Sequence, residues 1–191
     1  MNKKSLGPTN ILLPLPAALV LCGPPEQPNV IAIAWLTIVT PNPPQIGLSV
    51  DHRRYSYQLM TEHPDFTVNI PPAALAKVVD YCGIASGREH NKIAECNLTL
   101  RPGLKTPMPI IDECPLNLEC HRSQTIDFGT HTFFIGEILD TRVDEEKMNT
   151  SSQREIPDID KLDPLVYCSF VREYRQTGAT LGKAFSIGRK I

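Results

Sequence analysis

Residues 29–39 read Asn-Val-Ile-Ala-Ile-Ala-Trp-Leu-Thr-Ile-Val, and this stretch is the one that decides the fold. In an extended strand, successive side chains point to opposite faces of the sheet. One face then carries Asn29, Ile31, Ile33, Trp35 and Thr37, and the other carries Val30, Ala32, Ala34, Leu36 and Ile38. Neither face suits water, so one must lie on a core and the other under a helix, a second subunit or a ligand. The alternative is an ordinary central strand whose single tryptophan fills the core.

Similar short runs of β-branched and other apolar residues recur on both sides of this stretch, between Pro, Gly, Asn and Asp clusters. The predicted strands cover residues 16–22, 29–39, 46–51, 66–70, 117–126, 130–143 and 165–170. Asp127-Phe128-Gly129 indicates a hairpin between two of them. Helices are predicted over residues 57–63 with Ser56 as N-cap, over 73–82 with a stop at Gly83, and over 91–96. The pattern favours a mainly β fold with a few helices, closed into a barrel.

The length of 191 residues fits a single domain spanning 1–191. A net charge of -2 with scattered Lys and Arg offers no basic surface for nucleic acid. Prolines interrupt the apolar N-terminal stretch, and no run reaches the roughly 18 apolar residues that a membrane span requires. We therefore expect no membrane partner and a cytoplasmic location. The six cysteines are widely spread, which indicates reduced thiols.

The segment Asp51-His-Arg-Arg-Tyr-Ser-Tyr57 precedes a predicted helix and has the composition of an anion site. A helix N-terminus offers free N–H groups, Ser56 adds a hydroxyl, and arginines supply charge-assisted hydrogen bonds. The structural alternative is that Ser56 only caps the helix and that both arginines lie on a solvated turn.

Two other motifs do not lead to a site. Residues 178–184 resemble a phosphate-binding loop, but the glycine spacing is one short and no Ser or Thr follows Lys183. Cys114 and Cys120 lack the C-x-x-C spacing of a zinc site, so no metal is predicted.

Several motifs in one order resemble the flavin reductase-like family. They are Asn-x5-Trp at 29 and 35, Pro43-Pro44, Arg53-x-Tyr-Ser-Tyr-x-Leu59 and Phe66-Thr-Val-Asn-Ile-Pro71. Downstream, residues 80–88, Lys92, 109–120, 131–138 and 181–188 are similar to the flavoredoxin branch. The resemblance implies an FMN-binding split β-barrel that forms a homodimer, with the flavin near the subunit boundary.

The resemblance also implies the roles of individual residues. Asn29 and Trp35 would lie beside the isoalloxazine ring, and the backbone of residues 30–34 would bond its polar edge. Arg53 and Ser56 would hold the phosphate. The full set of expected cofactor-binding residues is Asn29, Val30, Ile31, Ala32, Ala34, Trp35, Ser49, Arg53, Ser56, Lys92, His131 and Tyr167. Phe170 is the substitute for Tyr167 if the aromatic position is shifted.

Lys92 and His131 are the expected catalytic residues, because a cation near the N1 edge of a flavin stabilises its reduced form. Their alternatives are an exposed helix lysine and a polar strand start. Cys82, at a helix end near the expected flavin pocket, is a candidate redox-active thiol.

The resulting hypothesis is an FMN-binding redox protein that transfers electrons through a non-covalent flavin. No Gly-rich dinucleotide fingerprint follows a strand, so the electron donor stays open between NAD(P)H and another redox protein. The alternatives are an NAD(P)H-dependent flavin oxidoreductase, which is an enzyme, and a binding module that has lost its flavin.

Overall fold

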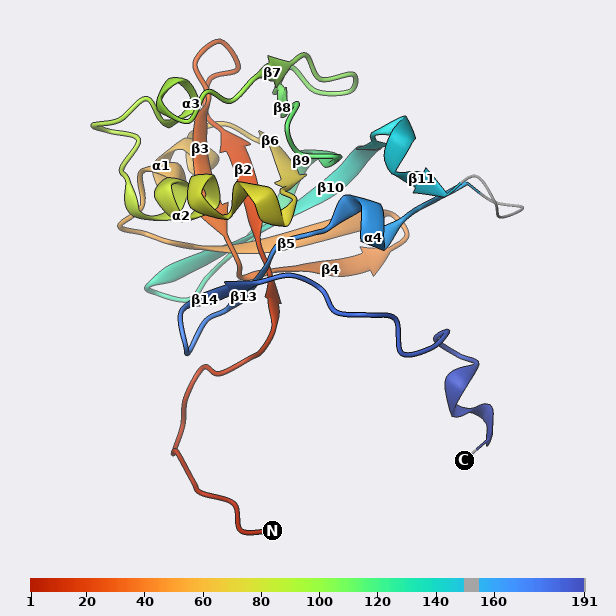
Figure 1. The fold of residues 1–191 in the computed structure, drawn as a ribbon. Coiled ribbons are helices and arrows are strands. Elements are labelled where there is room, and N and C mark those ends of the chain that lie inside the picture. The colour runs from red at the N-terminus through yellow and green to blue at the C-terminus, as the bar shows by residue number, and fades with distance from the viewer. Residues whose placement is uncertain (150–154, 191) are drawn as a thin grey trace.

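The computed structural model describes residues 1–149 and 155–190 (Figure 1). Seven antiparallel strands form the main sheet in the order β3-β2-β6-β9-β10-β5-β4. Their bounds are β2 (Ala18–Cys22), β3 (Asn29–Ile33), β4 (Leu36–Pro41), β5 (Pro44–Asp51), β6 (Asp65–Ile70), β9 (Leu116–Asp127) and β10 (His131–Val143). Both ends of the chain leave this body on the same side, and the C-terminal segment carries a 3₁₀ turn at Ile187–Lys190 (Figure 1).

The sheet closes where β3 passes into β4. These strands follow each other in the chain, yet they lie at opposite edges of the sheet. The junction is Ala34-Trp35, where the Trp35 carbonyl accepts a hydrogen bond from the Ser49 N–H of β5 at 2.9 Å. The single predicted strand over 29–39 is therefore wrong. The chain must turn there to leave the β3 edge of the sheet and join the β4 edge. The alternation of side chains between the two faces therefore stops at residue 34.

Two apolar clusters flank β2 and β3. Inside the barrel lie Ile31 and Ile33 together with Leu48, Phe66 and Phe134. On the outer side, Val30 packs with Leu19, Leu21, Val79 and Cys82. Because Val79 and Cys82 belong to helix α2 (Ala76–Ile84), the second face of β3 is covered by a helix of the same chain. Figure 1 shows α2 lying across β2 and β3.

The helices follow the predicted order with shifted ends. Helix α1 (Tyr55–Glu62) begins at Tyr55 with Arg54 as N-cap and no side-chain cap bond, so Ser56 is not the cap. A 3₁₀ turn (Ala73–Leu75) precedes α2, which continues through Gly83 to Ile84 rather than stopping at Gly83. Helix α3 (Lys92–Glu95) confirms the third prediction, and the Asn91 side chain caps it by accepting the Ala94 N–H at 3.2 Å.

Short elements complete the fold, and most of them went unpredicted because two or three residues carry no readable period. They are β1 (Leu15–Pro16), β7 (Leu100–Arg101), β8 (Ile110–Ile111), β11 (Met148–Asn149), β12 (Ile156–Pro157), α4 (Ile159–Leu162), β13 (Val166–Cys168), β14 (Glu173–Arg175) and 3₁₀ turns at Glu145–Lys147 and Ile187–Lys190. The predicted strand over 165–170 is shorter than expected, since β13 ends at Cys168. The hairpin at residues 127–129 and the six free cysteines are confirmed. Among the described residues, no helix has the length and apolar character to cross a membrane.

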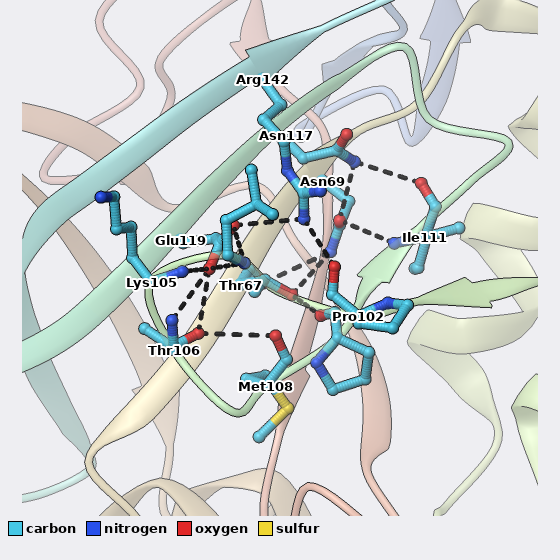
Figure 2. A network of polar contacts seen from close by, with 12 residues as sticks. Thr67, Asn69, Pro102, Lys105, Thr106, Met108, Ile111, Asn117, Glu119 and Arg142 are labelled. Carbon is cyan, nitrogen blue, oxygen red and sulfur yellow. Dashed lines mark hydrogen bonds and ion pairs between the residues drawn. The ribbon is translucent and has the colours of Figure 1, made fainter.

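A buried carboxylate fastens the Pro-rich segment after β7 to the sheet (Figure 2). Glu119 of β9 is 1% exposed, and its oxygens accept the backbone N–H groups of Leu104, Lys105 and Thr106 at 2.8–3.0 Å. The guanidinium of Arg142 lies 3.1 Å away. Burial alone raises the pKa of Glu119, but the three N–H donors and Arg142 together hold that pKa below its ordinary value. Glu119 is thus a charged anchor for a loop without regular structure.

A second group of buried amides lies beside it. Asn69 of β6 accepts the Ile111 N–H at 3.0 Å and the Asn117 amide at 2.9 Å, and it donates to the Leu19 carbonyl at 3.0 Å. Thr67 donates to the Pro109 carbonyl at 2.8 Å. The polar residues of the motif at 66–71 therefore hold strands and loop together.

Gly136 of β10 permits close packing inside the barrel. A Cβ at this position would lie 2.4 Å from the Phe66 ring and 3.3 Å from the Cys120 Cβ. We expect Gly136→Ala to lower the free energy of unfolding by about 1–3 kcal/mol, because a packed core must shift to admit the methyl group. Urea unfolding of this variant beside Gly178→Ala, where a Cβ meets nothing within 4 Å, checks it. Equal midpoints for the two variants would contradict the packing.

Candidate functional site

Strand β3 lies at the edge of the sheet, with β2 as its neighbour. An edge strand presents unpaired backbone N–H and C=O groups on its free side. Two hollows follow one another along β3, and they have volumes of about 240 and 310 Å³, near the lower end of small-molecule sites. We name them the Trp35 hollow and the Lys92 hollow.

The Trp35 hollow lies at the closure of the barrel. It is lined by Ile31, Ala32, Ile33, Ala34, Trp35, Ser49, Val50, Asp51, Arg54 and His131. The Trp35 side chain is 42% exposed, and its ring centre lies 5.2 Å from that of His131 with 30° between the planes. Arg54 donates to the Gly83 carbonyl at 3.0 Å and so joins the start of α1 to α2. The hollow offers an exposed aromatic ring, small side chains and a cation.

The Lys92 hollow lies at the other end of β3. Its lining residues are Pro24, Gln27, Pro28, Asn29, Val30, Tyr55, Leu59, Gly87, Arg88, Glu89, His90, Asn91, Lys92 and Ile93. Lys92 is 4% exposed, and its Nζ donates to the Cys82 carbonyl at 3.3 Å. Over residues 1–149 and 155–190, no carboxylate forms an ion pair with this ammonium group. Burial lowers the pKa of Lys92, so an anion in the hollow would satisfy a charge that has no carboxylate partner in the described part of the chain.

Asn29 and Gly87 approach each other closely at the mouth of this hollow. The Asn29 amide donates to Ser56 Oγ at 2.7 Å. A Cβ on Gly87 would lie 2.0 Å from Asn29 Oδ1, so only glycine fits there without displacing Asn29. Beside them, the Arg88 guanidinium lies 5.0 Å from the centre of the Tyr55 ring, at cation–π distance.

The structure brings most of the expected site residues together. The Trp35 hollow contains Ile31, Ala32, Ala34, Trp35, Ser49 and His131, and the Lys92 hollow contains Asn29, Val30 and Lys92. Tyr167 lines a third hollow that shares Ala32, Ala34 and Arg54 with the first. The alternatives of a core tryptophan and an exposed helix lysine are wrong, because Trp35 is exposed and Lys92 is buried.

Two expected phosphate ligands lie away from both hollows. The Arg53 side chain is 89% exposed and forms an ion pair with Asp51 at 2.6 Å, which holds the pKa of that carboxyl well below its usual range. Ser56 is 2% exposed behind Asn29. Lys92 and His131, the expected catalytic pair, line different hollows. Phosphate binding by Arg53 and Ser56 stays a prediction.

Among the lining residues that sequence reasoning missed are two arginines, Arg54 and Arg88, and their neighbours Tyr55 and Gly87. Arg54 follows Arg53 directly, and no pattern in the sequence says which of two adjacent arginines faces a hollow. The segment Ser86-Gly87-Arg88 carried a readable signal, because a glycine beside an arginine suits a close approach to an anion.

A β-barrel that is split along the edge strand β3, with two hollows beside that strand, is the architecture of the split-barrel flavin-binding proteins. The chain matches the flavin reductase like domain over residues 11–178 and belongs to that family.

Two solved structures place it in the flavoredoxin branch of the family. The chain is 38% identical to the flavoredoxin of Desulfovibrio vulgaris (Miyazaki F), with 98% of this chain and 100% of that chain covered and a TM-score of 0.91. It is 31% identical to the flavoredoxin from Methanosarcina acetivorans, with 98% of both chains covered and a TM-score of 0.88. An FMN-binding protein from Thermus thermophilus, 22% identical over 94% of this chain and 99% of that chain, shares the fold with a TM-score of 0.74. The protein is a flavin-binding redox protein.

Proposed function

We propose that the flavin is FMN, bound non-covalently along β3, and that the protein transfers electrons through it. The observation that carries the proposal is the buried Lys92 ammonium, which faces a hollow and has no carboxylate partner in the described part of the chain. FMN ends in a phosphate, so it supplies the missing anion. The name of the Thermus thermophilus protein, which shares the fold, gives FMN as its ligand.

The residues along the groove fit the parts of FMN in order. The Trp35 hollow has small and flat surfaces at Ala32, Ala34 and Trp35, which suit a planar ring system. The free edge of β3 offers N–H and C=O groups for the polar rim of that ring. At the other end, Lys92 and Arg88 supply two positive charges for a phosphate, and Gly87 allows Asn29 to lie beside them.

The protein's own contribution is to orient the cofactor and to set the charge around it. When bound, FMN supplies the capacity to take up and release electrons. His131, in ring contact with Trp35, presents an imidazole to the ring end of the groove. The Lys92 side chain is buried, so little water surrounds its ammonium group. A charge there would act on a bound flavin more strongly than a charge in solvent.

A homodimer belongs to the proposal. Trp35, Ile38 and Val39 are exposed apolar residues at and just after the barrel closure. A second subunit over this face would bury them and bring the Trp35 hollow to the subunit boundary.

The electron donor separates two forms of the function. NAD(P)H would make the protein a flavin oxidoreductase, whereas a protein donor would make it an electron carrier like the flavoredoxins it resembles. The third form, a binding module without flavin, conflicts with a groove that keeps Lys92 buried and unpaired.

Reconstitution tests the cofactor. We expect the purified protein to take up FMN to about one per chain and to become yellow, with flavin absorbance as the measurement. Stopped-flow mixing of the loaded protein with NADH and with NADPH then identifies the donor. Bleaching by either supports the oxidoreductase, and bleaching by neither supports a protein donor. A protein that stays colourless with excess FMN would refute the cofactor.

The position of the phosphate has its own prediction. We expect Arg88→Ala to weaken FMN binding by roughly 10- to 100-fold, because a charged hydrogen bond contributes about 1.5–3 kcal/mol. Arg53→Ala and Ser56→Ala serve as the comparison in the same fluorescence titration. A larger loss of FMN affinity in those two variants than in Arg88→Ala would show that the phosphate binds at the turn before α1 and not in the Lys92 hollow.

A further inference from the structure

The C-terminal arm, residues 176–190, follows β14 and extends away from the body of the protein (Figure 1). Its large apolar side chains face solvent, and Leu181 is 93% and Phe185 95% exposed. Hydrogen bonds within the arm give it local order. The Ile187 N–H donates to the Lys183 carbonyl and the Arg189 guanidinium to the Phe185 carbonyl, both at 2.9 Å. An ordered segment with exposed apolar side chains of this size has the character of a docking element.

The arm and the rest of the chain carry charges of opposite sign. The arm contains three basic residues and no Asp or Glu, so the remainder of the chain has a net charge of -5. A positive arm is attracted to the negative body of another copy of the same chain. It does not pack on its own body, where Leu181 and Phe185 stay exposed. The 15 extended residues span roughly 50 Å, enough to follow a 13-residue strand such as β10, which is about 44 Å long.

An apolar surface of matching character lies on β4 and β10. Val39 of β4 and Leu139 of β10 are both exposed. The two strands are connected through β5, because Thr40 of β4 pairs with Gln45 and Gln45 pairs with Glu137 of β10. The two exposed apolar side chains therefore lie on neighbouring parts of one sheet.

Negative charge gathers at the end of β10 beside this surface. The acids in and just after the strand are Glu137, Asp140, Asp144, Glu145 and Glu146. The two basic residues among them are already paired, Arg142 with Glu119 at 3.1 Å and Lys147 with Glu146 at 3.2 Å. Partial burial and the charges of Asp112 and Glu146 raise the pKa of Asp144, as expected where acids outnumber bases. We name Val39, Leu139 and these five acids the β4–β10 strip.

We propose that the C-terminal arm of one copy packs on the β4–β10 strip of a second copy. Leu181 and Phe185 then contact its apolar residues, and Lys183 lies beside its acids. A two-fold dimer makes this contact twice, once with each arm. Because β4 begins directly after Trp35, the arm of the second copy lies next to the Trp35 hollow. The inference rests on the proposed homodimer and adds the element that holds the two copies together.

Sedimentation equilibrium of the full-length protein tests the arm. We expect the unchanged protein to be a dimer and the double variant Leu181→Ser/Phe185→Ser to have a Kd roughly 100-fold higher, because two large apolar side chains lose their buried contacts. Its far-UV circular dichroism should not change, since both side chains are exposed in their own subunit. Leu104→Ser is the matched control. Leu104 is also exposed, and the segment between β7 and β8 that carries it lies at the far end of the molecule from both arms (Figure 1).

A further variant tests the surface on which the arm packs. Leu139→Ser should weaken the dimer, and its combination with Phe185→Ser should cost less than the two separate losses together, because the side chains share one contact. Fully additive losses would place the arm elsewhere and overturn the strip as its docking surface.

The same measurements separate the arm from the homodimer itself. If the unchanged protein is a dimer and Leu181→Ser/Phe185→Ser binds equally tightly, or if Leu104→Ser loses as much affinity, the role of the arm is refuted and the homodimer stands. A protein that is monomeric at every concentration refutes both. No step involves FMN, so a failure of the cofactor proposal would appear only in the reconstitution.

Discussion

The Glu119→Gln variant should lose about 3–5 kcal/mol of unfolding free energy. Glutamine keeps the shape but removes the charge that pairs with Arg142, and breaking one partner of a buried pair costs this amount. The NH₂ group of the glutamine would also face backbone N–H groups that bond to a carboxylate oxygen in the unchanged protein, so donors would meet donors and these hydrogen bonds would be lost. The loss should appear as a fall in melting temperature of roughly 6–20 °C, since each kcal/mol shifts a domain of this size by about 2–4 °C.

Glu113 provides the matched control. Its oxygens accept the Thr99 N–H at 3.0 and 3.1 Å, but the bonds lie at the surface and no arginine is involved. We expect Glu113→Gln to cost less than about 1 kcal/mol. Equal melting temperatures for the two variants would show that the buried carboxylate does not anchor the loop.

The effect of Glu119 should depend on pH in one direction. Its pKa is lower in the folded protein than in the unfolded chain, so its stabilisation is fully present above the unfolded value of about 4.3. As the pH falls through the folded pKa, the carboxylate takes up a proton and the stabilisation disappears. The difference between the unchanged protein and Glu119→Gln should therefore be constant near neutral pH and shrink in acid, as followed by urea unfolding.

The Lys92→Met variant should show opposite effects on binding and on stability. Methionine fills a similar volume without a charge, so the variant can no longer pair with the phosphate. FMN binding should weaken by roughly 10- to 100-fold. The apoprotein should gain about 1–2 kcal/mol of unfolding free energy, because a buried ammonium without a carboxylate partner is costly. Fluorescence titration and urea unfolding of the apoprotein measure the two effects.

Lys77→Met is the control for this variant. Lys77 is exposed on α2 and lines only a surface hollow beside Cys96. We expect neither FMN affinity nor stability to change by more than about 0.5 kcal/mol. A Lys92→Met protein that is destabilised and binds FMN normally would show that Lys92 is a structural residue rather than a ligand.

Opposite signs of the change in unfolding free energy for Glu119→Gln and Lys92→Met would distinguish a residue that stabilises the fold from one that binds a ligand. A core side chain loses stability when it is replaced, whereas a group held ready for a ligand is often costly until the ligand binds. Glu119 and Lys92 are both charged and almost fully buried, yet within residues 1–149 and 155–190 only Glu119 has a counter-charge. The variant of each residue should therefore behave differently in the absence of FMN.

The sequence alone determined the family and the longer strands, in which the alternation of buried and exposed side chains continues over several residues. β-branched runs with turn residues between them located β2, β5, β6, β9 and β10, because the alternation of buried and exposed side chains is a local property of each strand. The ordered motifs, Asn29 and Trp35 among them, indicated the flavin reductase-like family and nine of the residues that line the two hollows.

Only the tertiary structure decided how the barrel closes and which charged side chains are buried or paired. An apolar run from 29 to 39 reads as one strand, and the break at Ala34-Trp35 exists because β3 and β4 must reach opposite edges of the sheet. Whether Arg53 or Arg54 faces the groove depends on Asp51, which pairs with Arg53 across the turn. That Lys92 is buried, and that Glu119 anchors a loop through three backbone N–H groups, depends on segments distant in the chain. Such contacts have no local period, so they become visible only when the chain has folded.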